Sequence, residues 1–101
     1  MAEQDQDQNE KLMRMVESFI QLANEHSRQM SPGSVSSALL YAASRFNAYI
    51  VASHAENFDQ EKESSIRYFL DQYEKMLRDN MDDYQQNPIS SAEEKHQGAS
   101  D

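Results

Sequence analysis

The residue with the clearest capacity for chemistry is Arg45, the only Asp, Glu, Lys or Arg between Val35 and Ala55. A guanidinium within an apolar segment needs an acidic or carbonyl partner. Arg45 therefore forms either a structural ion pair or an anchor for an anion or for a partner's carboxylate. Together with Arg45, the candidate partner or ligand contacts are Asn47, Tyr49, His54 and Tyr68.

Most catalytic chemistry is excluded by residue types or spacing. The absence of Cys excludes disulfides, thiol nucleophiles and Cys-ligated metals. Two glycines, Gly33 and Gly98, cannot form a glycine-rich phosphate loop. His26, His54 and His96 fall on different predicted elements, and no Glu-x-x-His pair occurs within residues 9–85. The sequence therefore predicts no catalytic residue, no metal and no cofactor, which makes an enzyme the least favoured class.

The net charge of −9 is concentrated at the two ends of the chain. Eight acidic and eight basic side chains cancel over residues 11–78, while residues 1–10 carry −4 and residues 79–101 carry −5. Without a basic stripe, we expect no nucleic-acid partner. Arg45 and the serines of the apolar segment argue against a membrane span. The polar N-terminus lacks a secretory signal, so a cytoplasmic protein is expected.

Apolar periodicity predicts a helical domain over residues 9–85 between two disordered acidic tails, 1–8 and 86–101. Asn9 is the expected N-cap of the first helix, Pro32 opens the second, and Asn57 or Asp59 caps the third. The three expected helices span about residues 9–29, 32–55 and 59–84.

The first and third helices each carry one apolar stripe, with charged i,i+4 ladders on the outer side of the third. The first stripe is Leu12, Met15, Val16, Phe19, Ala23, His26 and Met30. The third-helix stripe is Ile66, Phe69, Leu70, Tyr73, Leu77, Asn80, Met81 and Tyr84.

The central helix has two packing faces, which predicts burial on both sides. One face is Val35, Ala38, Leu39, Ala42, Phe46, Tyr49 and Ile50. We expect the flanking helices to cover this face. The other face, rich in small residues, is the candidate dimer face: Ser37, Leu40, Ser44, Ala48, Val51 and Ala55.

These features predict an all-α, antiparallel three-helix bundle with a long central helix, which forms a homodimer. Wrapping of both faces within a monomer is the alternative. The preferred function is a non-enzymatic protein-interaction module, an adaptor or regulator, that binds itself or another protein. The alternative is a small-ligand or anion binder that uses Arg45 in a pocket between helices.

Four segments carry a resemblance to a known family: Ser31-Pro32-Gly33, residues 38–48 (Ala-Leu-Leu-Tyr-Ala-Ala-Ser-Arg-Phe-Asn-Ala), residues 68–77 and residues 80–84. In these segments the chain resembles a small proteobacterial family classed as a domain of unknown function. The resemblance covers about residues 12–84. It implies a bacterial cytoplasmic protein and assigns no functional residues.

Overall fold

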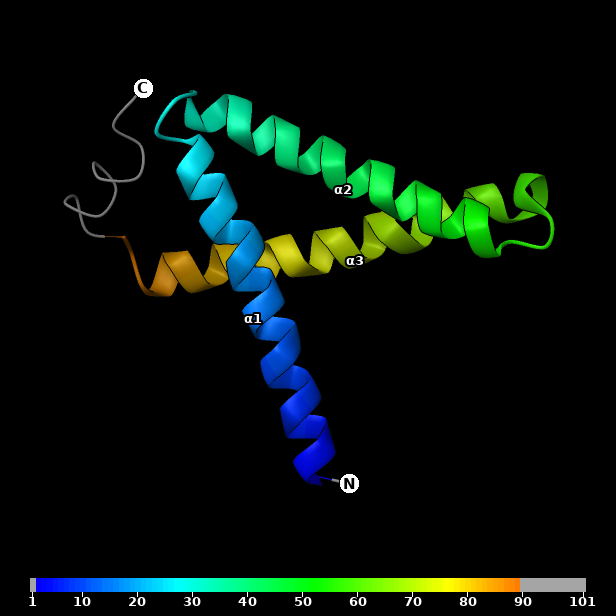
Figure 1. The fold of residues 1–101 in the computed structure, drawn as a ribbon, viewed down its shortest axis with the longest axis horizontal. Helices are drawn as coiled ribbons and strands as arrows, with labels where there is room; N and C mark the ends of the chain where they lie inside the picture. The colour runs from blue at the N-terminus through cyan, green and yellow to red at the C-terminus, as the bar shows by residue number, and fades with distance from the viewer. Residues whose placement is uncertain (1, 90–101) are drawn as a thin grey trace. The chain divides into compact units, whose positions relative to one another are not determined.

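A computed structural model describes residues 2–89, and they form three α-helices and no strand. The helices are α1 (Ala2–His26), α2 (Pro32–His54) and α3 (Phe58–Gln86) (Figure 1). The predicted all-α class with three helices is confirmed. The tail expected over 86–101 lies outside the described residues from 90 onward.

The chain divides into two compact units, with the boundary inside α2 between Leu39 and Leu40. The first unit contains α1 and the start of α2. The second contains the rest of α2 together with α3. Each unit is therefore described by itself.

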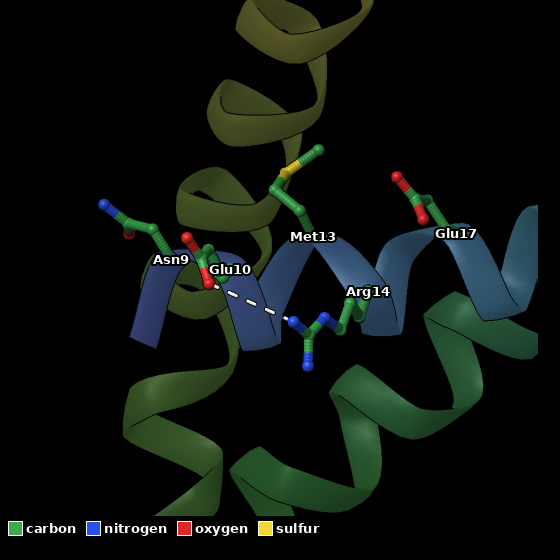
Figure 2. A pocket seen from close by; sticks show the side chains of 5 residues that line it. All are labelled: Asn9, Glu10, Met13, Arg14 and Glu17. Atoms are coloured by element: carbon green, nitrogen blue, oxygen red, sulfur yellow. Dashed lines mark ion pairs between the residues drawn. The ribbon is translucent and has the colours of Figure 1, made fainter. Parts of the chain in front are cut away.

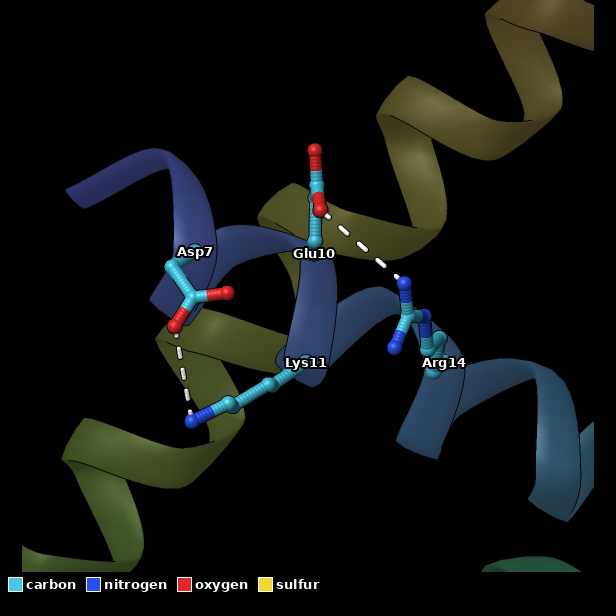
Figure 3. Close-up of polar contacts among 4 residues, drawn as sticks. All are labelled: Asp7, Glu10, Lys11 and Arg14. Carbon is cyan, nitrogen blue, oxygen red and sulfur yellow. Dashed lines mark ion pairs between the residues drawn. The ribbon is translucent and has the colours of Figure 1, made fainter. Parts of the chain in front are cut away.

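Helix α1 begins at Ala2 rather than at Asn9, so it includes residues that we expected to be a disordered tail. Asn9 lies inside the helix and does not cap it. Two i,i+4 ion pairs span this region: Asp7 with Lys11 at 3.5 Å and Glu10 with Arg14 at 4.0 Å (Figure 3). Such pairs, and acidic residues near a helix N-terminus, favour helix. Composition alone predicts disorder here, whereas these local interactions favour a helix.

The connection between α1 and α2 ends one helix and caps the next. After His26, a 3.2 Å bond from the Arg28 N–H to the Glu25 carbonyl tightens the last turn of α1. The Ser34 N–H then donates to Ser31 Oγ at 3.2 Å. Ser31 is thus the cap at the start of α2.

Helix α3 has a well-defined cap at each end. Asn57 is the N-cap: its side-chain oxygen accepts from the Gln60 N–H at 3.1 Å, and its own N–H donates to Glu61 Oε2 at 3.1 Å. At the other end, the Asn87 N–H donates to the Asp83 carbonyl at 2.8 Å. These reciprocal bonds satisfy backbone groups that a helix end leaves unpaired.

Within the second unit, α3 turns back along the second half of α2 after a three-residue connection (Figure 1). Side chains that are half-buried recur every three or four residues on both helices, which defines the sides that face each other. They are Asn47 and Val51 on α2, Ala55 directly after its end, and Glu61, Ser65, Phe69 and Gln72 on α3.

This hairpin uses a different side of each helix from the one expected. Val51 and Ala55 belong to the face that we assigned to dimerisation, and only Phe69 belongs to the predicted α3 stripe. Small residues on α2 allow a neighbouring helix to come close, because the distance between helix axes depends on the side chains at the contact. Side-chain size, in addition to apolar character, therefore determines which side of each helix faces the other.

The charged ladder of α3 is present in part as predicted. Lys75 pairs with Asp71 at 3.0 Å, and the Arg78 Nε donates to Glu74 at 2.8 Å. All four side chains are well exposed, so each pair stabilises the helix by only about 0.3–0.5 kcal/mol.

Candidate interaction surface

Arg45 lies exposed on α2, and it forms no ion pair or hydrogen bond with any residue that the structure describes. The structural ion pair that we considered is therefore not made within this part of the chain. An exposed guanidinium is solvated, so it does not carry the desolvation cost that would require a partner.

The neighbours proposed for Arg45 are not gathered around it. Asn47 is half-buried on the side of α2 that faces α3, whereas two residues of helix place Arg45 about 200° away. Tyr49 shares the side of Arg45, where it is 62% exposed and its ring lies 6.2 Å from that of Phe46. Arg45, Asn47 and Tyr49 therefore do not form one pocket.

His54 and Tyr68 have local contacts that explain their positions. The His54 Nδ1 lies 2.9 Å from the Ile50 carbonyl, so the ring bonds to the end of its own helix. A histidine in a last helical turn is a common partner of the unpaired carbonyls there. Tyr68 is 60% exposed and meets Phe69 edge to face, with ring centroids 5.4 Å apart.

The six residues of the candidate dimer face are divided by the structure. Val51 and Ala55 are half-buried in the hairpin, while Ser44 and Ala48 are exposed on the same half of α2. Ser44 bonds back to the Tyr41 carbonyl at 2.8 Å. Ser37 and Leu40 lie on opposite sides of the unit boundary, and both are exposed. This face is thus partly occupied by α3.

The described part of the chain brings no metal ligands together, and a hollow on its surface lies away from the candidate residues. No group of three or more His, Asp or Glu side chains there could hold a metal ion. A hollow on α1 is lined by Asn9, Glu10, Met13, Arg14 and Glu17 (Figure 2). All five side chains are exposed along one helix. Two of the charged ones, Glu10 and Arg14, form an ion pair with each other. The hollow contains none of the candidate residues.

The feature that stands out is apolar surface. None of the described residues is buried, and 24 large hydrophobic side chains are exposed. The apolar positions of α1 that we expected in a core, such as Leu12 and Phe19, are 57% and 55% exposed. Soluble monomers rarely leave contiguous apolar surface of this kind open, and such surface marks interaction sites.

We define the α3 stripe as the exposed apolar residues that follow one side of α3 from its middle to its end. Their exposed fractions range from 39% to 65%. The side of α3 that faces α2 lies roughly 100° around the helix from this stripe. The apolar periodicity predicts that this stripe lies in a core, whereas the structure leaves its residues exposed. Its members are Ile66, Leu70, Tyr73, Leu77, Met81 and Tyr84.

The fold and the surface together define a small all-α protein with capped, amphipathic helices and exposed apolar stripes. Comparison with family models matches residues 12–85 to a family described as protein of unknown function, DUF3144. The match covers most of the chain, and the chain belongs to this family. Neither the curated proteins nor the solved structures gave a significant match. No helix in residues 2–89 combines the length and apolar character needed to cross a membrane.

Proposed function

We propose that this chain is a protein-interaction module, an adaptor or regulator, whose amphipathic helices bind other polypeptide through their apolar sides. The observation that carries the proposal is that α1 and the α3 stripe keep large apolar side chains, such as Leu12, Phe19 and Leu70, exposed along one side. Helices in water gain most of their stability from packing an apolar face. We therefore expect these exposed stripes to bind a second polypeptide.

The anion-binding alternative has less support. Arg45 is exposed and unpaired among the described residues, which suits an anchor, but Asn47 lies on another side of α2 and does not converge with it. A small-ligand site needs a concave surface with several converging polar groups.

The test is the solution mass of the full chain, measured by light scattering over a concentration series, with circular dichroism to establish that it is helical. We expect either a mass above the 11.7 kDa of one chain or a helical monomer that binds the apolar dye ANS strongly. A helical monomer without ANS binding would overturn the proposal, because the stripes would then be closed within the chain.

A further inference from the structure

We infer that the partner of the α3 stripe is a second copy of this chain, with the two α3 helices pairing antiparallel about a two-fold axis between Asp71 and Gln72. This inference rests on the proposed function and names the occupant of one of its surfaces. It is carried by the spacing of the stripe and by the charges that flank it.

The spacing of the stripe is that of a coiled-coil seam. From Ile66 to Tyr84, intervals of four and three residues alternate without a break when Asn80 is counted in place of its stripe neighbour Met81, which then lies on one flank. An alternation of four and three keeps one side of a helix facing a partner helix over its whole length. The seam positions are Ile66, Leu70, Tyr73, Leu77, Asn80 and Tyr84, and every large apolar member is exposed in the single chain.

The two flanks of this seam carry charges whose order selects one arrangement. One flank runs Gln60, Arg67, Glu74 and Met81, and the other runs Lys62, Phe69, Met76 and Asp83. In an antiparallel pair, each flank lies beside the same flank of the other helix. A flank that is basic at one end and acidic at the other therefore complements its own copy.

The proposed axis brings opposite charges together on both flanks. Arg67 meets Glu74 of the second copy, and Lys62 meets Asp83 of the second copy, each twice by symmetry. In the seam, Leu70 packs on Tyr73 of the second copy. Neither Lys62 nor Arg67 has an ion pair within residues 2–89, so both cations are available.

Other arrangements of the same seam bring like charges together. A parallel pair places Lys62 beside Arg67 of the second copy. Sliding the antiparallel pair by seven residues in one direction places Glu74 beside its own copy, and in the other direction places Arg67 beside its own copy. Like charges across an interface disfavour the wrong pairing. Among these four arrangements, only the proposed register avoids them.

The α2 side of the hairpin is compatible with this pairing. The half-buried residues of α3 that face α2 lie roughly 100° from the centre of the seam. Helix α3 can therefore pack on α2 along one side and on a second α3 along the other. Phe69 lies between the two sides, where it is half-buried by the hairpin and can contact Met76 of the second copy.

The test uses two charge reversals in the full chain, Arg67→Glu and Glu74→Arg. Alone, each variant faces two like-charge contacts in its homodimer, and we expect its dimer dissociation constant to rise about tenfold. Mixed in equal amounts, the two variants form a heterodimer in which both contacts are again opposite in charge. We therefore expect the mixture to recover the dissociation constant of the unaltered chain within about threefold.

The matched control is Arg78→Glu, which makes a similar reversal on α3 outside the seam and both flanks. Arg78 pairs with Glu74 within its own helix, so this variant measures the effect of like charges along the helix alone. It should dimerise like the unaltered chain. If Arg67→Glu behaves no differently from Arg78→Glu and mixing restores nothing, the pairing is overturned.

A second measurement does not depend on charge reversals. The chain has no Cys, so a single introduced Cys can carry a spin label. Labels at Asp71→Cys should lie close together, whereas labels at Gln60→Cys should lie about 35 Å apart along the helix axis. A parallel pair would give equal, short distances at both positions and would overturn the inference.

Failure of this inference can be told apart from failure of the proposed function. A chain that self-associates but whose variants all keep the unaltered affinity overturns α3 pairing alone, because another apolar side then forms the contact. A chain that stays monomeric at all concentrations also overturns α3 pairing. In that case strong ANS binding retains the interaction module, and absence of binding overturns it as well.

Discussion

Asn57 takes part in two 3.1 Å hydrogen bonds at the start of α3, one with Gln60 through its side chain and one with Glu61 through its backbone N–H. The Asn57 amide oxygen receives the Gln60 N–H, which would otherwise have no partner in the helix. Glu61 is half-buried and secures the N–H of Asn57 in return. This cap fixes where α3 begins and therefore fixes the register of the hairpin.

Replacing this cap tests its contribution. We expect Asn57→Ala to lower the free energy of unfolding by about 1 kcal/mol, because the Gln60 N–H loses its acceptor. Urea unfolding followed by circular dichroism measures the change. Asn24→Ala is the control, since Asn24 is exposed inside α1 without a hydrogen bond, and alanine is the better helix former. Equal losses in both variants would contradict the role assigned to the cap.

At the scale of elements, the hairpin depends on a narrow line of contact. Phe69 is the largest of the half-buried side chains of the second unit, and it lies among small or polar ones such as Ser65 and Ala55. Its neighbour Tyr68 is 60% exposed, although the two rings touch. Apolar contact in this unit is thus concentrated in one aromatic residue.

We expect Phe69→Ala to destabilise the chain by about 1–2 kcal/mol, less than the cost of removing a fully buried Phe, because the ring is only half-buried. The matched change Tyr68→Ala removes a ring of similar size from an exposed position and should cost about 0.5 kcal/mol or less. Urea midpoints at one protein concentration compare the two variants. A larger loss of stability in Tyr68→Ala than in Phe69→Ala would contradict the assignment of Phe69 as the residue of α3 that packs on α2.

The elements were predictable from local chemistry, whereas their rotations were not. Pro32, Ser31 and Asn57 are strong local signals, and the structure places the α2 and α3 boundaries within two residues of the prediction. The start of α1 was missed, because polarity suggested disorder where Asp7–Lys11 and Glu10–Arg14 pairs occur within a helix. The composition of its segment predicts a special role for Arg45, whereas in the structure Arg45 is exposed and does not converge with Asn47. Apolar periodicity does not indicate which side of a two-faced helix packs on its neighbour, because that choice depends on contacts between residues far apart in the sequence.

For the whole molecule, the question is what stabilises long helices whose residues are not buried. Helices α2 and α3 are 23 and 29 residues long. Their ion pairs are few and exposed, and a single half-buried line of contact runs between the two helices. Intrinsic propensity and such pairs contribute little compared with packing of an apolar face. The stability of this chain should therefore be coupled to its association with another polypeptide.

That coupling makes the melting temperature depend on concentration. If the folded form is the α3-paired dimer, mass action stabilises it as protein is added, and Tm should rise by about 3–4 °C for each tenfold increase. Circular dichroism melts over a hundredfold range of concentration measure this slope. A folded monomer has the same Tm throughout that range, because folding then involves one molecule. The Arg67→Glu chain should melt lower than the unaltered chain at each concentration, and the Arg78→Glu chain should remain close to the unaltered one.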